Sequence, residues 1–327
     1  MVIKITRIDE RGNVYFDTES FKTKCFVLGD SLLLCNDERT FHEIPFHSGL
    51  YCKMFEPVLV EKDDTIFLAI RHGNAAKKYG LRVGQQVKLL LNVKGGFWEK
   101  ENAYSFEEII DRELYKNEED YANFRPLFLG KKNLYRSSSP FDNAYGRAES
   151  VLSCIEEYKI KTIIDMADSE AELNNLVCVA NAKTQEVVKR QTIFAIGDDT
   201  GLFSREFEQS VLLAMRALIV AETPCLIHCR AGKRRSGFIC AILQALYGMS
   251  AEQIMDDYMV SYKNNNGITY GDNPKRYEYL KVDTIYKILT HINGPELEYL
   301  GQSTKEYLNK IGLSAKEIAS LELIVHQ

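Results

Sequence analysis

Short runs in which apolar and polar residues alternate dominate the first hundred residues. The alternation predicts strands, and glycines between the runs indicate turns. The expected strands lie at residues 2–5, 13–16, 65–70 and 86–93, with a broken apolar run at 24–34. Several short strands separated by turns favour a small β-barrel or sandwich. We assign residues 1–120 to this β-rich N-terminal domain, whose role and partner the sequence leaves open.

The pattern changes around residues 104–123, where the chain becomes strongly charged. Within this stretch, the apolar residues of 106–114 recur at helical spacing. The spacing predicts a linker helix or the edge of the next domain.

Beyond Pro126, segments with helical periodicity alternate with short apolar runs. We expect helices at 144–157, 170–189, 205–221 and 237–247, and strands at 161–166, 192–196 and 225–228. Strands separated by helices are typical of an α/β fold with a central, largely parallel sheet flanked by helices. We assign residues 121–327 to this domain.

Composition narrows the functional classes. The 327 residues include 41 basic and 46 acidic side chains, a formal net charge of −5, which excludes a protein-wide basic surface for nucleic acid. No stretch approaches the roughly 20 apolar residues that span a bilayer. The eight cysteines form no CxxC pair, which favours free thiols in a reducing compartment, expected to be the cytoplasm, over disulfides or a zinc site.

One segment, residues 228–237, carries a recognisable chemistry. It follows a buried strand and opens an apolar helix, so its backbone N–H groups and the positive end of the helix dipole converge on one point. Such a turn binds anions. Cys229 stands at the end of the strand, where the same field stabilises a thiolate and makes it nucleophilic.

Other residues of the segment complement this cysteine. Arg235, six residues later, can fold back and bind two phosphate oxygens in bidentate fashion. Gly232 lets the backbone turn where a Cβ would obstruct it. Ser236 places a hydroxyl near the sulfur, where it can stabilise the thiolate as a leaving group. His228 precedes the cysteine, and the complete set is far more specific than a cysteine and an arginine alone.

The segment resembles the HCx5R[ST] signature of the cysteine-based protein tyrosine phosphatases. It is most similar to the HCxAGKxRTG loop of bacterial and fungal dual-specificity tyrosine/lipid phosphatases. Residues 133–140 are similar to that family's NxYRSxxP segment, 160–165 to its GIKTVIDLR strand, and 306–318 to its closing helices. The likeness covers roughly 126–327 and implies a tyrosine-phosphatase-like fold. Two departures are the missing arginine of DLR, where the chain reads Asp165-Met166-Ala167-Asp168, and Arg234 where the subgroup commonly has Asp.

The resemblance also implies a general acid about 30 residues before the cysteine, on a loop that follows a strand. Asp198 and Asp199 lie 31 and 30 residues before Cys229. We favour Asp199 because the Asp-Thr pair of 199–200 resembles the acid loop of small dual-specificity members. Alternatively, one or both aspartates cap a helix that begins near Phe203.

The implied reaction is hydrolysis of phosphate monoesters through a cysteinyl-phosphate, with no metal or other cofactor, because the loop supplies the positive charge. His228 is expected to orient the loop and tune the thiol. Together with the backbone at Ala231 and Gly232, three further cations could bind substrate: Arg230, Lys233 and Arg234. They favour phosphoinositides or inositol polyphosphates, with phosphorylated proteins as the other substrate class. Alternatively, Arg230 or Arg234 points to solvent or pairs with nearby acids.

Two other functions fit parts of the signature. A catalytically weak phosphate-binding module, or pseudophosphatase, would use the loop without turnover. Chemistry of the arsenate-reductase type would need resolving cysteines, and Cys225 and Cys240 flank the loop. Burial in the incoming strand and the outgoing helix is the simpler interpretation of these two thiols.

Overall fold

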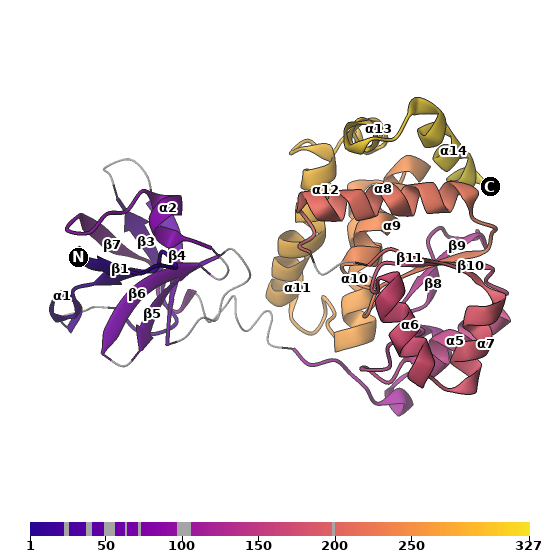
Figure 1. The fold of residues 1–327 in the computed structure, drawn as a ribbon, viewed down its shortest axis with the longest axis horizontal. Helices are drawn as coiled ribbons and strands as arrows, with labels where there is room; N and C mark the ends of the chain where they lie inside the picture. The colour runs from indigo at the N-terminus through magenta and orange to yellow at the C-terminus, as the bar shows by residue number, and fades with distance from the viewer. Residues whose placement is uncertain are drawn as a thin grey trace. The chain divides into compact units, whose positions relative to one another are not determined.

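The computed structural model describes residues 1–22, 26–36, 41–48, 56–62, 64–70, 73–96, 106–197 and 200–327. The chain forms two compact units, Met1–Ser105 and Phe106–Gln327 (Figure 1). Residues 106–120, which the sequence analysis grouped with the N-terminal domain, contact the second unit. For example, the Ile109 amide donates a hydrogen bond to the Asn265 carbonyl at 2.7 Å.

The first unit is a closed barrel with the strand order β1-β2-β6-β5-β4-β3-β7. Its elements are β1 (Val2–Ile8), β2 (Val14–Phe16), α1 (Thr18–Lys22), β3 (Ser31–Cys35), β4 (Phe41–His47), β5 (Pro57–Lys62), β6 (Thr65–Ile70), α2 (Ala75–Tyr79) and β7 (Gln86–Val93). Neighbouring strands are antiparallel, except for the parallel pair β4 and β5.

Alternation along the strands explains the barrel interior. Every second side chain points inward, and those of Ile3, Ile5, Leu32 and Leu34 are fully buried in one apolar cluster. The expectation of a β-rich domain is therefore confirmed, in its barrel form. Strands β4 and β5 were missed by the sequence analysis, and Pro45 inside β4 is a residue that normally argues against a strand.

The second unit has a five-stranded sheet in the order β11-β10-β12-β9-β8, parallel except for β8. Its strands are β8 (Arg125–Pro126), β9 (Leu134–Ser137), β10 (Thr162–Asp165), β11 (Thr192–Ala195) and β12 (Cys225–His228). In the ladder, Asp165 is paired with His228, and His228 with Ser137. The carboxyl ends of three parallel strands therefore meet at one edge of the sheet, which confirms the predicted α/β class.

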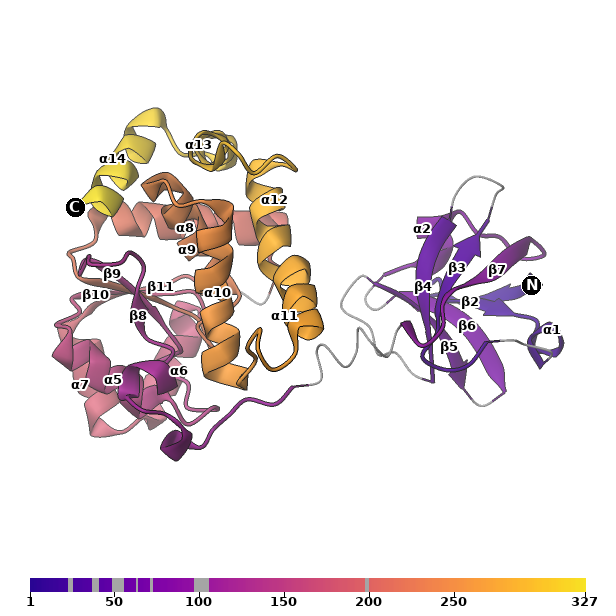
Figure 2. The same cartoon turned by 180° about the vertical axis from the view of Figure 1, so that it is seen from behind.

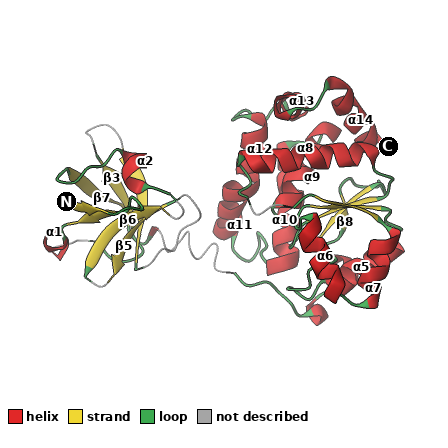
Figure 3. Cartoon of the chain, viewed as in Figure 1, coloured by secondary structure: helices red, strands yellow, loops and turns green. Residues whose placement is uncertain are grey.

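Helices cover both faces of this sheet (Figures 2 and 3). They are α4 (Glu118–Tyr121), α5 (Ala148–Glu157), α6 (Glu170–Val179), α7 (Ala182–Arg190), α8 (Arg205–Val220), α9 (Arg235–Tyr247), α10 (Ala251–Asn266), α11 (Pro274–Lys281), α12 (Lys287–Asn293), α13 (Leu300–Ile311) and α14 (Ala315–His326). Helices α5, α6 and α7 lie on one face, and α8 and α9 lie on the other. None of the helices in the described ranges is long and apolar enough to cross a membrane.

Three predicted helices differ from the observed ones. Residues 106–114 form only a 3-10 turn at Arg112–Leu114, because the preceding residues dock on α10 in an irregular conformation. The helix expected at 170–189 is split into α6 and α7, and the Asn181 side chain caps the start of α7. The helix expected from residue 144 begins at Ala148.

A buried cluster of charges joins the sheet edge to α10. The Asp257 carboxylate lies 2.7 Å from Arg125 Nε and 2.8 Å from Arg136 Nη1. Burial opposes the charge on Asp257, but the two arginines outweigh it and lower its pKa to about 2. The carboxylate is therefore ionised at neutral pH, and its single negative charge is shared by two guanidinium groups that the fold has removed from water.

We predict that Asp257→Asn destabilises the second unit by about 3–5 kcal/mol, because it leaves two buried arginines without their counter-charge. Urea unfolding followed by circular dichroism measures the change. The adjacent Asp256→Asn is the matched control, since Asp256 pairs with Lys281 at the surface, where such pairs contribute about 0–1 kcal/mol. Equal losses from the two variants would contradict the prediction.

Candidate active site

The segment between β12 and α9 forms the turn that the sequence predicted. Strand β12 ends at His228 and α9 begins at Arg235, so residues 229–234 connect them. No side-chain hydrogen bond caps the start of α9, which leaves the positive end of its dipole facing the turn. We call residues 229–235 the phosphate loop.

Gly232 allows this loop to lie against β9. Its φ of +63° is in the left-handed region, and a Cβ there would lie 2.2 Å from the Ser137 carbonyl oxygen. The loop can therefore pack on the end of β9 only with glycine at this position.

Hydrogen-bond donors from distant parts of the unit hold the loop carbonyls pointing into the protein, away from the anion site. The Gly232 carbonyl accepts hydrogen bonds from Arg136 Nη2 at 3.0 Å and from Asn123 Nδ2 at 3.2 Å. The Ala231 carbonyl accepts from Asn265 Nδ2 at 2.7 Å. Because these carbonyls face the protein, the opposite side of the peptide groups is left to face an anion.

Two carbonyls around Cys229, at the start of the loop, are fixed in the same way. The Ser139 amide donates to the Arg230 carbonyl at 3.0 Å, and the Met166 amide donates to the His228 carbonyl at 2.9 Å. The ends of β9 and β10 thus hold the cysteine from two sides.

The structure brings the predicted cysteine and serine together and places the arginine side chain on the segment that follows β10. Cys229 is buried, and its Sγ lies 3.3 Å from Ser236 Oγ. Arg235 Nη1 donates to the carbonyls of Met166 and Ala167, at 3.4 and 3.3 Å. The guanidinium therefore lies between the phosphate loop and the segment that follows β10.

His228 lies in a buried acidic environment behind the loop. Its Nε2 is 3.6 Å from Asp165 Oδ1, and the Phe141 ring meets the imidazole edge-on. Burial lowers the pKa of His228 to about 4, so the imidazole is neutral at pH 7. A neutral, fully buried ring is suited to supporting the loop and not to exchanging protons with substrate.

Two aspartates near His228 were not singled out from the sequence. Burial raises the pKa of Asp165 to about 7, although hydrogen bonds from the Ala167 and Asp168 amides oppose the rise. Burial and the neighbouring Asp165 raise the pKa of Asp168 to about 6. Asp168 is thus a third candidate proton donor, in addition to Asp198 and Asp199.

The predicted acids Asp198 and Asp199 lie outside the described residues. The residue before them is described, and it lies beside the site: the Gly197 amide donates to the Asp168 carbonyl at 2.9 Å. Asp168 in turn follows Ala167, whose carbonyl contacts Arg235. The chain therefore reaches the two candidate acids from a point close to the phosphate loop.

The three additional cations differ in their surroundings. Arg230 is exposed, and its Nε lies 2.7 Å from Asp142 Oδ2. Lys233 is buried, and its ammonium lies 2.8 Å from Asn266 Oδ1 and 3.5 Å from Glu108 Oε1. Arg234 is exposed and has no ion-pair partner within the described ranges. One of the three is thus directed away from solvent.

The two cysteines that flank the loop are buried. Burial raises the pKa of the Cys225 thiol to about 12 and that of the Cys240 thiol to about 11. Both are neutral thiols at physiological pH and cannot readily attack a bond to Cys229. This counts against resolving-cysteine chemistry.

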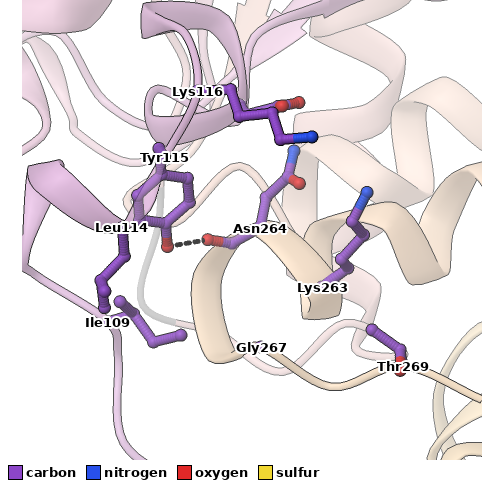
Figure 4. A pocket seen from close by; sticks show the side chains of 9 residues that line it. Ile109, Leu114, Tyr115, Lys116, Lys263, Asn264, Gly267 and Thr269 are labelled. Carbon is purple, nitrogen blue, oxygen red and sulfur yellow. Dashed lines mark hydrogen bonds between the residues drawn. The ribbon is translucent and has the colours of Figure 1, made fainter. Parts of the chain in front are cut away.

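A cavity of about 510 Å³ lies at the C-terminal end of α10. It is lined by residues that follow the start of the second unit and by the C-terminal end of α10, including Ile109, Tyr115 and Asn264. Figure 4 shows the Tyr115 hydroxyl donating to the Asn264 main-chain carbonyl. None of residues 228–236 lines this cavity, so it is separate from the site.

A comparison with models of protein families shows which family the chain belongs to. The sequence model of the tyrosine phosphatase family matches residues 129–324, more than half of the chain. The chain belongs to the tyrosine phosphatase family. The phosphate loop, with its cysteine and arginine, lies inside the matched region of this family member. No curated protein sequence matches the chain.

Solved structures that match part of the chain include proteins described as phosphatases. The catalytic core of the PP-IP phosphatase SIW14 from S. cerevisiae is 21% identical, with a TM-score of 0.32, and the match covers 54% of this chain and 95% of that one. For TpbA from P. aeruginosa the identity is 15%, the TM-score 0.32 and the coverage 57% and 92%. An uncharacterised conserved protein from Thermotoga maritima is 13% identical, with a TM-score of 0.25 and coverage of 27% and 35%.

We predict that Gly232→Ala abolishes binding of inorganic phosphate, because the new Cβ pushes the loop away from the Ser137 carbonyl. Isothermal titration calorimetry measures the binding. Gly248→Ala is the matched control: Gly248 also has a positive φ, +93°, but no atom of the described residues lies within 4 Å of its Cβ position. This control should cost about 1–2 kcal/mol of stability and leave phosphate binding unchanged. Normal phosphate binding by Gly232→Ala would contradict the prediction.

Proposed function

We propose that this family member is an active, metal-independent phosphatase that hydrolyses phosphate monoesters through a cysteinyl-phosphate. The observation that carries the proposal is the Cys229 Sγ, 3.3 Å from the Ser236 hydroxyl, in a loop whose carbonyls point into the protein. A nucleophile, a partner for its thiolate and a set of anion-binding amides are thereby combined at one helix N-terminus.

In the first step, the phosphate group occupies the loop and is bound by Arg235. The Cys229 thiolate attacks phosphorus as the bond to the leaving oxygen breaks, and Asp199 donates its proton to that oxygen. The products are an alcohol or phenol, a cysteinyl-phosphate and the Asp199 carboxylate. The loop amides and Arg235 stabilise the charge that develops on the equatorial oxygens.

In the second step, water attacks the phosphorus of the cysteinyl-phosphate. The Asp199 carboxylate takes a proton from this water, and the sulfur–phosphorus bond breaks. The electron pair returns to Cys229, where a hydrogen bond from Ser236 stabilises the thiolate. Inorganic phosphate leaves, and His228 and the loop backbone retain their arrangement throughout.

For the substrate, we propose a dual-specificity site that accepts multiply phosphorylated ligands such as phosphoinositides or inositol polyphosphates. Arg234 and Arg230 support this, because both are exposed residues of the loop and only Arg230 has a carboxylate partner in the described part of the chain. Phosphorylated proteins are the alternative class. We also propose a reducing compartment such as the cytoplasm, since the six described cysteines are free.

The direct test is hydrolysis of p-nitrophenyl phosphate in the presence of EDTA. We expect turnover by the wild type, and none by Cys229→Ser, which should still bind inorganic phosphate because the loop backbone is unchanged. Tight phosphate binding by a wild type that shows no turnover would instead identify a binding module. Cys229→Ser then serves as a substrate-trapping variant. Its binding to phosphopeptides, phosphoinositides and inositol polyphosphates identifies the preferred substrate class.

A second prediction concerns the proton donor. Asp199→Asn should lower kcat/KM by about 10²–10⁴-fold for an alkyl phosphate, whose leaving oxygen needs a proton, and much less for p-nitrophenyl phosphate. Asp198→Asn should have little effect on either substrate. If Asp168→Asn produces this leaving-group pattern and Asp199→Asn does not, the acid is Asp168.

A further inference from the structure

The Lys233 side chain is directed away from the anion site. Its ammonium lies over the Tyr262 ring, 4.5 Å from the centroid, and 5.2 Å from the centroid of the Phe106 ring. Asn266 Oδ1 and Glu108 Oε1 accept hydrogen bonds from it, at 2.8 and 3.5 Å. A cation in the middle of the phosphate loop is therefore bound by residues of another segment.

That segment is the start of the second unit, residues 106–110, which we call the connector. The Ile109 amide donates to the Asn265 carbonyl at 2.7 Å, and Asn266 Nδ2 donates to the Glu107 carbonyl at 3.0 Å. Arg147 Nη2 donates to the Ile109 carbonyl at 2.6 Å. The connector backbone is thus fixed on the C-terminal end of α10 before its side chains reach the loop.

Asn265 joins the same two segments by a second route. Its carbonyl accepts from the Ile109 amide, while its side chain donates to the Ala231 carbonyl at 2.7 Å. The connector is therefore linked to two consecutive parts of the loop, through Asn265 at Ala231 and through Glu108 at Lys233.

The charge balance favours Glu108 as the residue that keeps Lys233 in this position. Burial lowers the pKa of Lys233, and Glu108 opposes that effect. The side chains of Glu108 and Lys233 are only 18% and 9% exposed. A buried ammonium without a counter-charge would leave this position for solvent.

We propose that Glu108 is a positioning residue for the phosphate loop, acting through Lys233 to hold the middle of the loop in its anion-binding geometry. The inference rests on the proposed phosphatase function, and it changes the role assigned to Lys233. Lys233 anchors the loop to the connector, and Arg234 and Arg230 remain as the additional cations for substrate.

The Glu108→Gln variant distinguishes this role from direct substrate binding, because the two roles predict opposite changes in the affinity for phosphate. If Lys233 is an anchor, removing the Glu108 charge loosens the loop and weakens phosphate binding. If Lys233 instead binds substrate, removing its competitor frees the ammonium and strengthens binding.

The experiment uses the full chain with four substitutions: Glu108→Gln, Lys233→Met, both together, and Glu107→Gln. Glu107 is the matched control, because it is the neighbouring glutamate but its side chain is exposed. Calorimetry gives the Kd for inorganic phosphate, steady-state kinetics on p-nitrophenyl phosphate gives kcat and KM, and thermal unfolding gives Tm.

We expect Glu108→Gln to raise the Kd for phosphate and KM together, roughly tenfold, as small displacements in a preorganised site do. The double variant should bind phosphate no more weakly than Lys233→Met alone, because both substitutions remove the same contact between Glu108 and Lys233. Glu107→Gln should match the wild type.

Three outcomes would overturn the proposal. They are tighter phosphate binding by Glu108→Gln, additive losses in the double variant, or a fall in Tm and kcat with an unchanged KM, which indicates a purely structural role. The Kd for phosphate needs no turnover, so a catalytically inactive wild type would refute the proposed function while this comparison still tests Glu108.

Discussion

The site depends on one constraint: a loop that binds an anion through its N–H groups must turn its carbonyls into the protein, where each needs a donor. Here the donors come from segments far apart in sequence. Asn123 lies before the first strand of the sheet, Arg136 lies within β9, and Asn265 lies near the end of α10. The packing of the sheet on α10 is therefore also what shapes the anion site.

The same constraint explains why charge is buried beneath the site. Arg136 can donate to the Gly232 carbonyl only as a buried guanidinium, and Asp257 supplies its counter-charge. On the other side of the loop, Asp165 and Asp168 surround a neutral His228, and burial raises the pKa of both carboxyl groups. Positive charge is thus concentrated where an anion is expected to bind, and burial disfavours the negative charge of the two aspartates behind the loop.

The sequence predicted those parts of the molecule that local patterns determine. The apolar run of β12 and the start of α9 were predictable because strand, turn and helix are contiguous, and the loop signature marked Cys229 and Arg235. The carbonyl donors could not be identified in this way, because the partnership of Asn265 with Ala231 depends on tertiary packing. In the connector, tertiary packing overrides a local pattern: its apolar residues recur at helical spacing, but the segment docks on α10 without forming a helix. The acid residues at 198–199 remain a prediction.

Helix α9 has a consequence for how ionic strength affects the protein. Its residues 236–246 are all buried, so the helix dipole directed at the loop is surrounded by protein instead of water and salt. Mobile ions screen such a field weakly. The charges of Arg230 and Arg234 are exposed to solvent, and they are screened within about 8 Å at physiological ionic strength. Added salt should therefore weaken the attraction for peripheral phosphates more than the hold on the one in the loop. If the proposed multiply phosphorylated ligands bind, their preference over singly phosphorylated ones will therefore depend on ionic strength as well as on the sequence.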